Sequence, residues 1–416
     1  KEGVLSWCWW CTAENQPCFL IQPPPPPPPP PSPLVQALAL AGGRPAMAIR
    51  VLFPSSSSSS SSFSTAQPTR RTSRQRRGFC CFCSSSTTSS DEVSSSSSMM
   101  TVSITGATGF IGRRLVDKLL SEDHKVCVLT RSTSKNKASS VFPASRYPGV
   151  TIADKEGDWE RCIRDSTGVV NLAGMPISTR WSPEVKKEIL QSRVNVTSKV
   201  VDHINTSTSA SSNGNVNGNG PSVFVSATAV GYYGTSETDS FDESSPSGND
   251  YLAHVCREWE GRARQVKQEH VRLVLIRIGV VLGKDGGALA KMIPLFMMFA
   301  GGPLGTGTQW FSWIHVDDLV DLIYESLRNP AYTGVINGTA PNPVRLSELC
   351  DRLGQVVGRP SWLPVPGLAI KALLGEGATV VLDGQKVLPA RATHLGFSYR
   401  YPYVRDALKA IIAKQL

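Results

Sequence analysis

Short apolar runs alternate with amphipathic stretches along the chain from about residue 99. The apolar runs have the length and composition of buried β-strands and lie at Thr101–Ile104, Lys125–Thr130, Gly168–Leu172, Ser222–Ser226 and Arg272–Val281. Between them, Arg113–Glu122 and Ser182–Ile204 repeat their apolar residues at helical spacing. Strands that alternate with helices in this way favour βαβ units. The pattern therefore predicts an α/β protein with a doubly wound parallel sheet.

The first 98 residues have a different composition, which is dominated by Pro and Ser. Pro23–Pro31 is an unbroken proline run, which adopts polyproline II or no fixed structure. Because the first Met is Met47, we expect residues 1–46 to be an untranslated or disordered leader. Residues 47–98 are rich in Ser and Arg and contain no acidic residue before Asp91, which is typical of a disordered organelle transit peptide. The high Ser content favours a chloroplast over a mitochondrion, with a generic disordered basic tail as the alternative.

The residues after this leader are numerous enough for a nucleotide-binding domain and a smaller second lobe. We place the domain at residues 99–285 and a substrate-binding C-terminal lobe at residues 286–416. Residues 206–221 consist mainly of Ser, Thr, Asn and Gly and predict a flexible insert within the domain. No run of roughly 18 uninterrupted apolar residues exists, so the sequence predicts no transmembrane helix and leaves peripheral membrane association open.

The formal net charge of +10 suits an anionic cofactor or substrate. Nucleic acid is not an expected partner, because the sequence has no stripe of Lys and Arg with interleaved aromatic residues. Six of the ten cysteines lie in the leader, and the other four are Cys127, Cys162, Cys256 and Cys350, far apart in sequence. This spacing indicates neither a disulfide framework nor a metal site, and it favours a reducing compartment.

The clearest chemical signal is a glycine-rich segment that joins the first predicted strand to the first predicted helix. Gly106, Gly109 and Gly112 follow the pattern G-x-x-G-x-x-G, with Thr108, Phe110 and Ile111 between them. Glycines here let the backbone turn sharply and approach a pyrophosphate, whose charge meets the helix N-terminus. The order of strand, turn and helix predicts a Rossmann-type dinucleotide site formed by these six residues. A glycine-rich turn without a ligand is the alternative.

The residues after the second predicted strand distinguish between two dinucleotides. A site that prefers NAD carries Asp or Glu about 20 residues beyond the glycines, where the carboxylate binds the ribose 2′-hydroxyl. Here Thr130, Arg131 and Ser132 follow, with no acidic residue, and Asp123 precedes the strand. Arg131 would attract a 2′-phosphate, so the sequence predicts NADP, with NAD as the less favoured cofactor. A solvated loop charge is the alternative for Arg131.

Several motifs together resemble an extended short-chain dehydrogenase/reductase. They are Thr105–Gly112, Asn171–Gly174, Val225–Gly234 and Arg277–Gly283. The resemblance is closer to the NAD-dependent epimerase/dehydratase-like branch of epimerase family proteins, as indicated by Arg180–Ser182, Gly301–Gly305, Trp310–Leu319 and Gly334–Pro341. It covers about residues 101–413 and implies that Leu172, Ala173 and Gly174 also contact the cofactor. With the leader, it implies a plastid member from a plant, and some relatives carry a cell-division-inhibitor label.

The same resemblance implies an active site built from a Ser or Thr and a Tyr-x-x-x-Lys motif. Thr228, with Ser226 as the alternate, and Tyr251 take the first two positions. In such a site the tyrosine moves a proton, and the lysine lowers the tyrosine pKa from its usual value near ~10. Val255 stands where that lysine is expected, so the usual cation of this chemistry is missing. His254 is either a partial substitute or a packing residue.

Five further residues are candidates for substrate binding. They are Arg180, Trp181, Arg193, Trp310 and Trp313. The two arginines would meet an anionic substrate such as a nucleotide diphosphate, whereas the tryptophans would line a pocket or form an aromatic core. We expect His315 and Asp317 to organise the junction between the two lobes.

Two functions compete on these observations. The first is an NADP-binding oxidoreductase or epimerase-like enzyme that acts on a small or nucleotide-linked substrate in the chloroplast. The second is a non-catalytic NADP-binding regulator, for example in plastid division at the envelope. The glycine-rich segment, Thr228 and Tyr251 support the enzyme, and Val255 supports the regulator.

Overall fold

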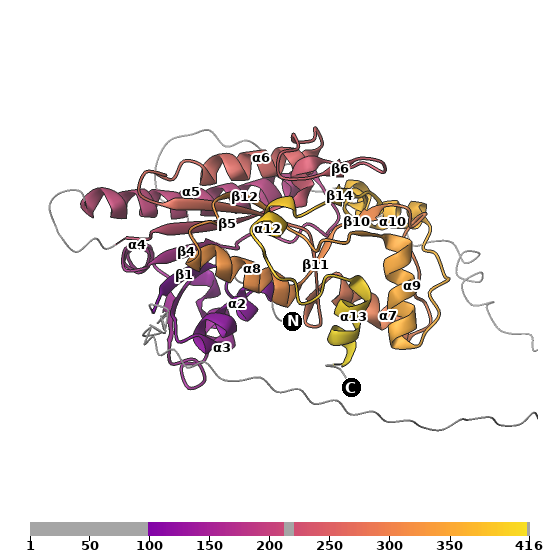
Figure 1. Cartoon of the computed structure of the whole chain (residues 1–416), viewed down its shortest axis with the longest axis horizontal. Coiled ribbons are helices and arrows are strands. Elements are labelled where there is room, and N and C mark those ends of the chain that lie inside the picture. The colour runs from indigo at the N-terminus through magenta and orange to yellow at the C-terminus, as the bar shows by residue number, and fades with distance from the viewer. Residues whose placement is uncertain (1–98, 212–219, 414–416) are drawn as a thin grey trace, which may run out of the picture. The chain divides into compact units, whose positions relative to one another are not determined.

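The computed structural model describes residues 99–211 and 220–413 (Figure 1). The contacts divide the chain after Ser90, and the described residues all belong to the compact unit that runs from Asp91 to Leu416. The predicted leader at residues 1–46 and the predicted transit peptide at residues 47–98 lie outside the described residues. The same holds for residues 212–219 of the predicted insert.

Seven parallel strands form the central sheet, in the order β12-β7-β5-β4-β1-β2-β3. Their bounds are β1 Thr101–Thr105, β2 Lys125–Leu129, β3 Val150–Ala153, β4 Gly168–Asn171, β5 Val223–Ala229, β7 Arg272–Ile278 and β12 Gly334–Gly338. The apolar pattern did not predict β3 and β12, which occupy the two edges. Because β1 lies between β4 and β2, the strand order reverses there, and ligands of such sheets bind at the carboxyl end of that switch point.

Helices cover both faces of the sheet and confirm the doubly wound α/β fold. Their bounds are α2 Phe110–Ser121, α3 Lys135–Val141, α4 Glu156–Arg164, α5 Pro183–Ser211, α6 Tyr251–Ala263 and α8 Val316–Arg328, with 3-10 turns at η1 Ser132–Ser134 and η2 Val230–Tyr233. On one face, α2 and α8 bury Leu115 and Leu319 against the strands. On the other face, α4, α5 and α6 contribute Ile163, Ile204 and Ala263 to a second cluster. Figure 1 shows α5 and α6 above the strands and α2 and α8 below them.

The predicted strand at Arg272–Val281 consists of two strands, because β7 ends at Ile278 and β8 begins at Val280. Gly279 separates them, and a Cβ there would collide with the carbonyl oxygen of Ser312. From this point β8 (Val280–Gly283) pairs with β9 (Gly286–Gly287) and β11 (Trp313–His315) instead of the central sheet. A close approach between backbones, which an apolar pattern does not record, therefore decides the break.

The C-terminal part has a core of its own around α7 (Leu289–Met297), α9 (Leu346–Val357) and α13 (Val404–Ala413). The shorter elements beside it are β6 Ser240–Phe241, β10 Trp310–Phe311, β13 Val344–Arg345, β14 Lys386–Val387, α10 Gly367–Leu374, η3 Gly375–Ala378, α11 Thr379–Leu382 and α12 Ala390–His394. Within residues 286–416, α8 and β12 return to the central sheet. The expected lobe is therefore interrupted by elements of the nucleotide-binding domain.

The expectation of a flexible insert at residues 206–221 needs correction at its start. Residues 206–211 form the last turns of α5 instead of a loop, and the hydroxyls of Thr206 and Ser207 donate to the carbonyls of Asp202 and His203 at 2.9 and 2.8 Å. A polar composition does not exclude a helix when each hydroxyl finds a carbonyl one turn back.

None of the helices in residues 99–211 and 220–413 combines the length and apolar character needed to cross a membrane.

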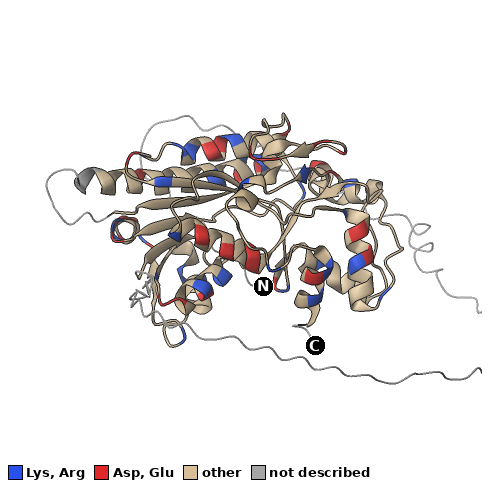
Figure 2. Ribbon diagram, viewed as in Figure 1, with Lys and Arg blue, Asp and Glu red and all other residues tan. Residues whose placement is uncertain are grey.

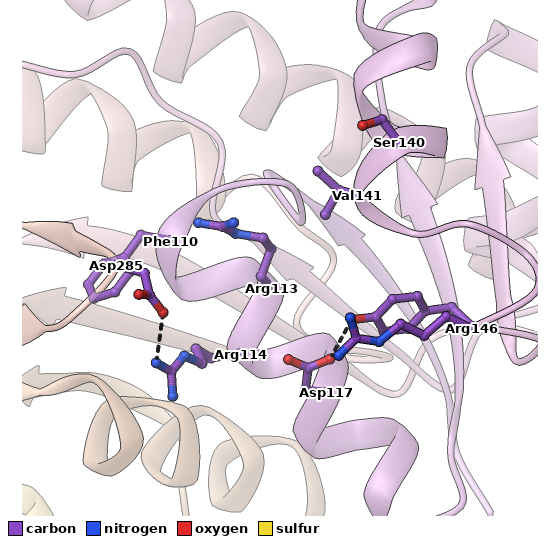
Figure 3. Close-up of a pocket in the computed structure, with 9 residues that line it drawn as sticks. Phe110, Arg113, Arg114, Asp117, Ser140, Val141, Arg146 and Asp285 are labelled. Carbon is purple, nitrogen blue, oxygen red and sulfur yellow. Dashed lines mark hydrogen bonds and ion pairs between the residues drawn. The ribbon is translucent and has the colours of Figure 1, made fainter. Parts of the chain in front are cut away.

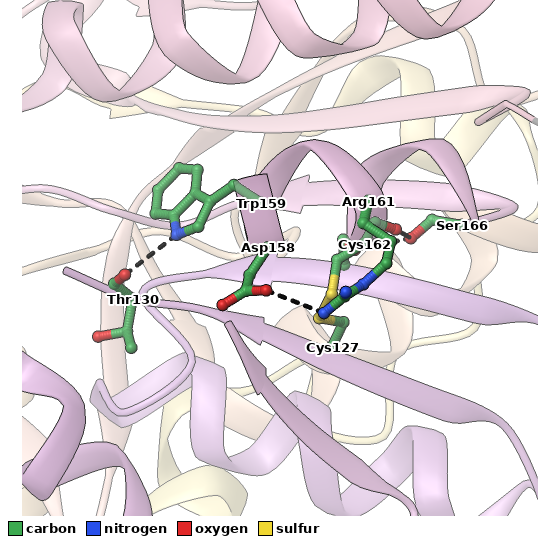
Figure 4. Close-up of a disulfide and its surroundings, with 8 residues drawn as sticks. Cys127, Thr130, Asp158, Trp159, Arg161, Cys162 and Ser166 are labelled. Carbon is green, nitrogen blue, oxygen red and sulfur yellow. Dashed lines mark hydrogen bonds and ion pairs between the residues drawn. A yellow bond between two sulfur atoms is a disulfide. The ribbon is translucent and has the colours of Figure 1, made fainter. Parts of the chain in front are cut away.

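The body cysteines are also not all unpaired. Cys127 in β2 and Cys162 in α4 form a disulfide across 35 residues of sequence, with their Cα atoms 6.3 Å apart (Figure 4). Their wide spacing gave no signal for pairing, because the packing of α4 on the sheet brings them together. Cys256 and Cys350 are free and buried.

Candidate functional site

The glycine-rich turn lies at the carboxyl end of β1, against the loop that follows β4. Gly106 has a φ of 70°, and a Cβ there would lie 2.7 Å from the carbonyl carbon of Leu172. A Cβ at Gly112 would lie 2.6 Å from the Cα of Ala107. Side chains at these positions would push α2 away from β1 and block the approach of residues 172–174. The two segments that the sequence assigned to the cofactor therefore meet in the structure.

The N-terminus of α2 offers backbone donors to a ligand in this turn. Gly109 is the N-cap, and among the described residues no side chain caps the helix and no acidic residue lies in its first turn. Thr108 precedes the cap and Ile111 follows it by two residues. The ring of Phe110 packs on Gly283, where a Cβ would lie 2.5 Å from the ring, so Phe110 would reach a ligand through its backbone. These uncapped N–H groups and the glycine cradle fit the diphosphate of a dinucleotide.

Asn171, the last residue of β4, holds the second segment in place. It is fully buried, and its Oδ1 accepts hydrogen bonds from the hydroxyl of Thr105 at 2.6 Å and the N–H of Ala173 at 3.4 Å. Its amide donates to the hydroxyl of Thr197 in α5 at 2.8 Å. One buried amide thus links β1, α5 and Leu172–Gly174, which fixes the loop beside the glycine turn.

Two arginines lie at the carboxyl ends of the neighbouring strands β1 and β2. Arg131 follows β2 and is exposed, as an NADP site requires, while Arg113 lies in the first turn of α2. No carboxylate among the described residues forms an ion pair with either. Asp154, which follows β3, pairs with Lys135 at 3.2 Å, so its charge is compensated. Arg113 was not among the predicted site residues. Its signal in the sequence is a basic residue directly after the third glycine.

A hollow of about 510 Å³ opens beside this region, between α2, α3 and Asp285 (Figure 3). Its wall on α2 carries Arg113, Arg114 and Asp117. Arg114 is neutralised by Asp285 at 3.3 Å and by Asp317 at 3.4 Å. Figure 3 shows Arg113 and Arg114 leaving α2 in different directions, and only Arg114 is directed to Asp285. In Figure 2 the acidic segments of α8 lie beside the basic ones of α2, which agrees with the pairing of Arg114 and Asp317.

The two residues assigned to catalysis have separate hydrogen-bond partners. Thr228 is buried near the end of β5, and its hydroxyl donates to Oε1 of Glu260 at 3.3 Å. Tyr251 begins α6, and its hydroxyl donates to the carbonyl oxygen of Lys186 at 2.5 Å. Ser226, the alternate, is fully buried and accepts from the amide of Asn171 at 3.4 Å. In this conformation the hydroxyl proton of Tyr251 is donated to Lys186 and is not available to another acceptor.

A buried ion pair between Arg277 and Glu260 lies next to Thr228. The sequence did not predict this pair as part of the site. Arg277 donates to both carboxylate oxygens of Glu260, at 2.8 and 2.9 Å, and both side chains are 3% exposed. Arg277 also donates to the hydroxyl of Tyr233 at 3.0 Å, and that hydroxyl donates to Oδ1 of Asn337 at 2.7 Å. Burial raises the pKa of Tyr233 to about 12. The network joins α6 to β5, β7 and β12 near the carboxyl ends of these strands.

The side chain of Val255 is 2% exposed and packs in an apolar cluster with Trp181 and Ile189. His254 is exposed to solvent. Two cations of α5 lie near Tyr251. The ammonium of Lys186 lies over its ring, 4.8 Å from the centroid, and Arg193 donates to the carbonyls of Ile189 and Met175, each at 2.9 Å. Burial raises the pKa of Tyr251, and the positive charge of Arg193 opposes that shift. Arg193 therefore supports the loop after β4 through two backbone carbonyls.

The other substrate candidates divide between core and surface. Trp313 is fully buried and donates to the carbonyl of Asn342 at 3.0 Å, so it is a core residue. Trp181 is 9% exposed, and its ring meets the ring of Tyr251 edge-on at 5.2 Å. Trp310 is half-buried and stacks under the guanidinium of Arg345 at 3.8 Å. Arg180 is exposed and donates to the carbonyl of Ala372 at 2.7 Å.

His315 and Asp317 organise the start of α8. Nδ1 of His315 accepts from the N–H of Asp317 at 3.1 Å and so caps the helix, while the carboxylate of Asp317 reaches Arg114 in α2. The ring of His315 also lies 4.1 Å from that of Tyr401, near the C-terminal helix α13. No group of three or more His, Cys, Asp or Glu in the described part of the chain is arranged to hold a metal ion.

The chain matches known proteins over nearly all of the described region. Residues 102–337 match the NAD dependent epimerase/dehydratase family, and residues 365–411 match a domain of unknown function (DUF1731). The chain is 68% identical over 313 residues to "Epimerase family protein SDR39U1 homolog, chloroplastic" from Arabidopsis thaliana, which covers 75% of this chain and 87% of that protein.

Two solved structures agree with this assignment. The human epimerase family protein SDR39U1 (isoform2), crystallised with NADPH, superposes with a TM-score of 0.64 at 32% identity and covers 76% of this chain and 100% of its own. A nucleoside-diphosphate sugar epimerase from Corynebacterium glutamicum superposes with a TM-score of 0.58 at 30% identity and covers 76% of this chain and 59% of its own. The glycine cradle, the parallel sheet and these matches together establish that the chain belongs to the NAD dependent epimerase/dehydratase family.

Proposed function

We propose that this protein binds NADPH at the turn between β1 and α2. The observation that carries the proposal is the uncapped N-terminus of α2, which follows the Gly106 turn packed against Leu172 and Ala173 and lies near Arg131 and Arg113. The diphosphate would lie on the first-turn N–H groups of α2, and the two arginines would bind the 2′-phosphate. The human relative crystallised with NADPH supports this choice of dinucleotide.

The catalytic part of the proposal is an oxidoreductase or epimerase-like activity on a small or nucleotide-linked substrate. Bound NADPH supplies a hydride, and the protein must hold the substrate and move a proton. Tyr251 would move that proton once its hydroxyl leaves the carbonyl of Lys186, and the charge of Arg193 would oppose the rise in the tyrosine pKa that burial causes. The relative named as a nucleoside-diphosphate sugar epimerase supports a nucleotide-linked substrate.

A second candidate is a non-catalytic NADPH-binding regulator, including a role in plastid division. The burial of Val255 favours it, because an apolar side chain fills the position from which a lysine would reach the nicotinamide ribose. Tyr251→Phe separates the two functions, since it removes a hydroxyl and keeps the ring that packs on Trp181. Complementation of a deletion strain fails with this variant if the protein is an enzyme and succeeds if the protein is a regulator. NADPH binding by the variant is the control for folding.

The direct test of cofactor binding is a fluorescence titration of the purified protein with NADPH and NADH. We expect tighter binding of NADPH, because two cations and no unpaired carboxylate surround the predicted 2′-phosphate position. Equal affinities, or tighter binding of NADH, would contradict the assignment. We further propose that the protein works in the chloroplast, in the stroma or at the inner envelope. The Ser- and Arg-rich segment 47–98 and the chloroplastic Arabidopsis relative support this location.

A further inference from the structure

The disulfide between Cys127 and Cys162 joins β2, the strand that leads to the proposed 2′-phosphate site, to helix α4 (Figure 4). Cys127 belongs to β2, four residues before Arg131, and Cys162 belongs to α4 on the outer side of the sheet. Cys127 is 4% exposed, whereas Cys162 is half-buried, so a protein reductant approaches the bond from the side of Cys162.

The bond closes a segment that contains Arg131, one of the two arginines proposed to bind the 2′-phosphate. Residues 127–162 include the end of β2, Arg131, the turn η1, helix α3 and strand β3. A second link lies parallel to the disulfide, because the indole N–H of Trp159 in α4 donates to the carbonyl of Thr130 at 3.0 Å (Figure 4). Helix α4 is therefore attached to the chain before Arg131 by a covalent bond at Cys127 and a hydrogen bond at Thr130.

The backbone at Cys162 is anchored separately from its sulfur. The hydroxyls of Ser103 and Ser166 both donate to the carbonyl oxygen of Cys162, at 3.1 and 2.5 Å. Helix α4 would consequently stay in place after the bond breaks, and the change would be a looser end of β2 rather than local unfolding.

The two other cysteines of the described region are unsuited to the same chemistry. Cys256 and Cys350 are buried and unpaired, and burial raises the pKa of their thiols to about 11 and about 12. Thiol–disulfide exchange requires a thiolate and an accessible sulfur. The pair formed by Cys127 and Cys162 is thus the site in the described region where a redox signal can act.

We propose that the Cys127–Cys162 disulfide is a thiol–disulfide exchange site that sets the affinity for NADPH through the loop at Arg131. The inference rests on the proposed NADPH site. In the oxidised protein, the bond holds the end of β2 against α4 and keeps the Arg131 loop ordered before the cofactor arrives. In the reduced protein, ordering this loop becomes a cost of binding, and the affinity falls.

The ligand of this site is a protein dithiol. One thiolate of the reductant attacks the sulfur of Cys162, forms a mixed disulfide with it and releases Cys127 as a thiolate, which takes up a proton. The second thiol of the reductant, as a thiolate, then attacks the first sulfur of the reductant in the mixed disulfide. This step releases Cys162 as a thiolate, which takes up a proton. The protein gains two electrons and two protons, and the reductant loses them as it becomes a disulfide.

The experiment compares NADPH binding by the full chain in the oxidised state and after reduction by dithiothreitol. Differential alkylation and peptide mass spectrometry report the state of Cys127 and Cys162 separately from the six cysteines before residue 99. Cys162→Ser removes the bond and keeps a small polar side chain at a half-buried position. Cys350→Ala is the matched control, since Cys350 lies in the C-terminal core. Thermal unfolding checks that each variant folds.

We expect reduction to weaken NADPH binding by about 3–10-fold in the wild type and in Cys350→Ala, as for the loss of a preorganised loop. Cys162→Ser should bind NADPH as weakly as the reduced wild type and should not respond to dithiothreitol. Dissociation constants within twofold in the two redox states would overturn the inference and leave the proposed function intact. Alkylation of both Cys127 and Cys162 in protein treated with an oxidant would overturn the inference as well. Failure to bind NADPH in either state would overturn the proposed function, and the inference with it.

Discussion

The buried ion pair between Glu260 and Arg277 offers the sharpest test of how the site is supported. Glu260→Gln keeps the size and shape of the side chain and removes its charge. The bidentate pair is then lost, because the amide nitrogen of the new side chain is a donor and faces a guanidinium that also only donates. Arg277 keeps its hydrogen bond to Tyr233, and no other carboxylate among the described residues forms an ion pair with it.

The expected cost follows from burial. Both side chains are 3% exposed, so little water can solvate the guanidinium that remains. Removing one partner of a buried pair destabilises a protein by about 3–5 kcal/mol. The contact of Glu260 with Arg264 adds little, since Arg264 is 48% exposed and such pairs contribute about 0–1 kcal/mol. The hydroxyl of Thr228 also loses a charged acceptor.

Urea denaturation of the two proteins, followed by circular dichroism, measures the difference in unfolding free energy. Glu258→Gln is the matched control, because Glu258 is exposed on the same helix and its change should stay within about 0.5 kcal/mol. The double variant Glu260→Met with Arg277→Met should recover most of the loss, since it leaves no buried charge. A loss below about 1 kcal/mol for Glu260→Gln would refute the reasoning, because it would mean that water or another group compensates Arg277.

Three further predictions concern the cofactor, a buried histidine and the leader. Arg131→Asp should shift the preference from NADPH toward NADH by about 1–3 kcal/mol, measured by titration, with Arg161→Asp on exposed α4 as the control. His124 is 3% exposed, and burial lowers its pKa, so the stability it contributes is complete above its unfolded pKa of ~6.5 and is lost as the pH falls below that value. His124→Gln should therefore flatten the fall in unfolding free energy between pH 7 and pH 5, while His270→Gln, at an exposed position, should not. Residues 47–98 fused to a reporter should direct it into chloroplasts and be removed there.

Each of these predictions has a clear contrary result. An unchanged dinucleotide preference in Arg131→Asp would mean that this arginine does not contact the 2′-phosphate. An equally steep pH dependence in His124→Gln would assign the acid sensitivity to other groups. A reporter that stays in the cytosol, or that enters mitochondria alone, would remove the support that the leader gives to a chloroplast location.

The sequence by itself determined the class of the fold and the cofactor segment. Strand–helix alternation is a local pattern, and so is the order of strand, glycine turn and helix at Thr101–Ser121. Both are written in consecutive residues, because apolar spacing follows the geometry of each element and glycines follow the needs of one turn. Arg131 could be assigned for the same reason, since its place is fixed by the end of the preceding strand.

Only the tertiary structure decided which distant residues meet. The partner of Cys127, the neighbours of Arg193 and the pairing of Glu260 with Arg277 join residues of different elements, and no periodicity records such contacts. The break at Gly279 likewise depends on a carbonyl of Ser312 that approaches from another strand. Val255 shows what the family pattern can and cannot reveal. The sequence shows that the expected lysine is missing, but it does not show which cations lie near Tyr251 instead. The cations that lie near Tyr251, Lys186 and Arg193, become visible only when α5 is packed beside α6.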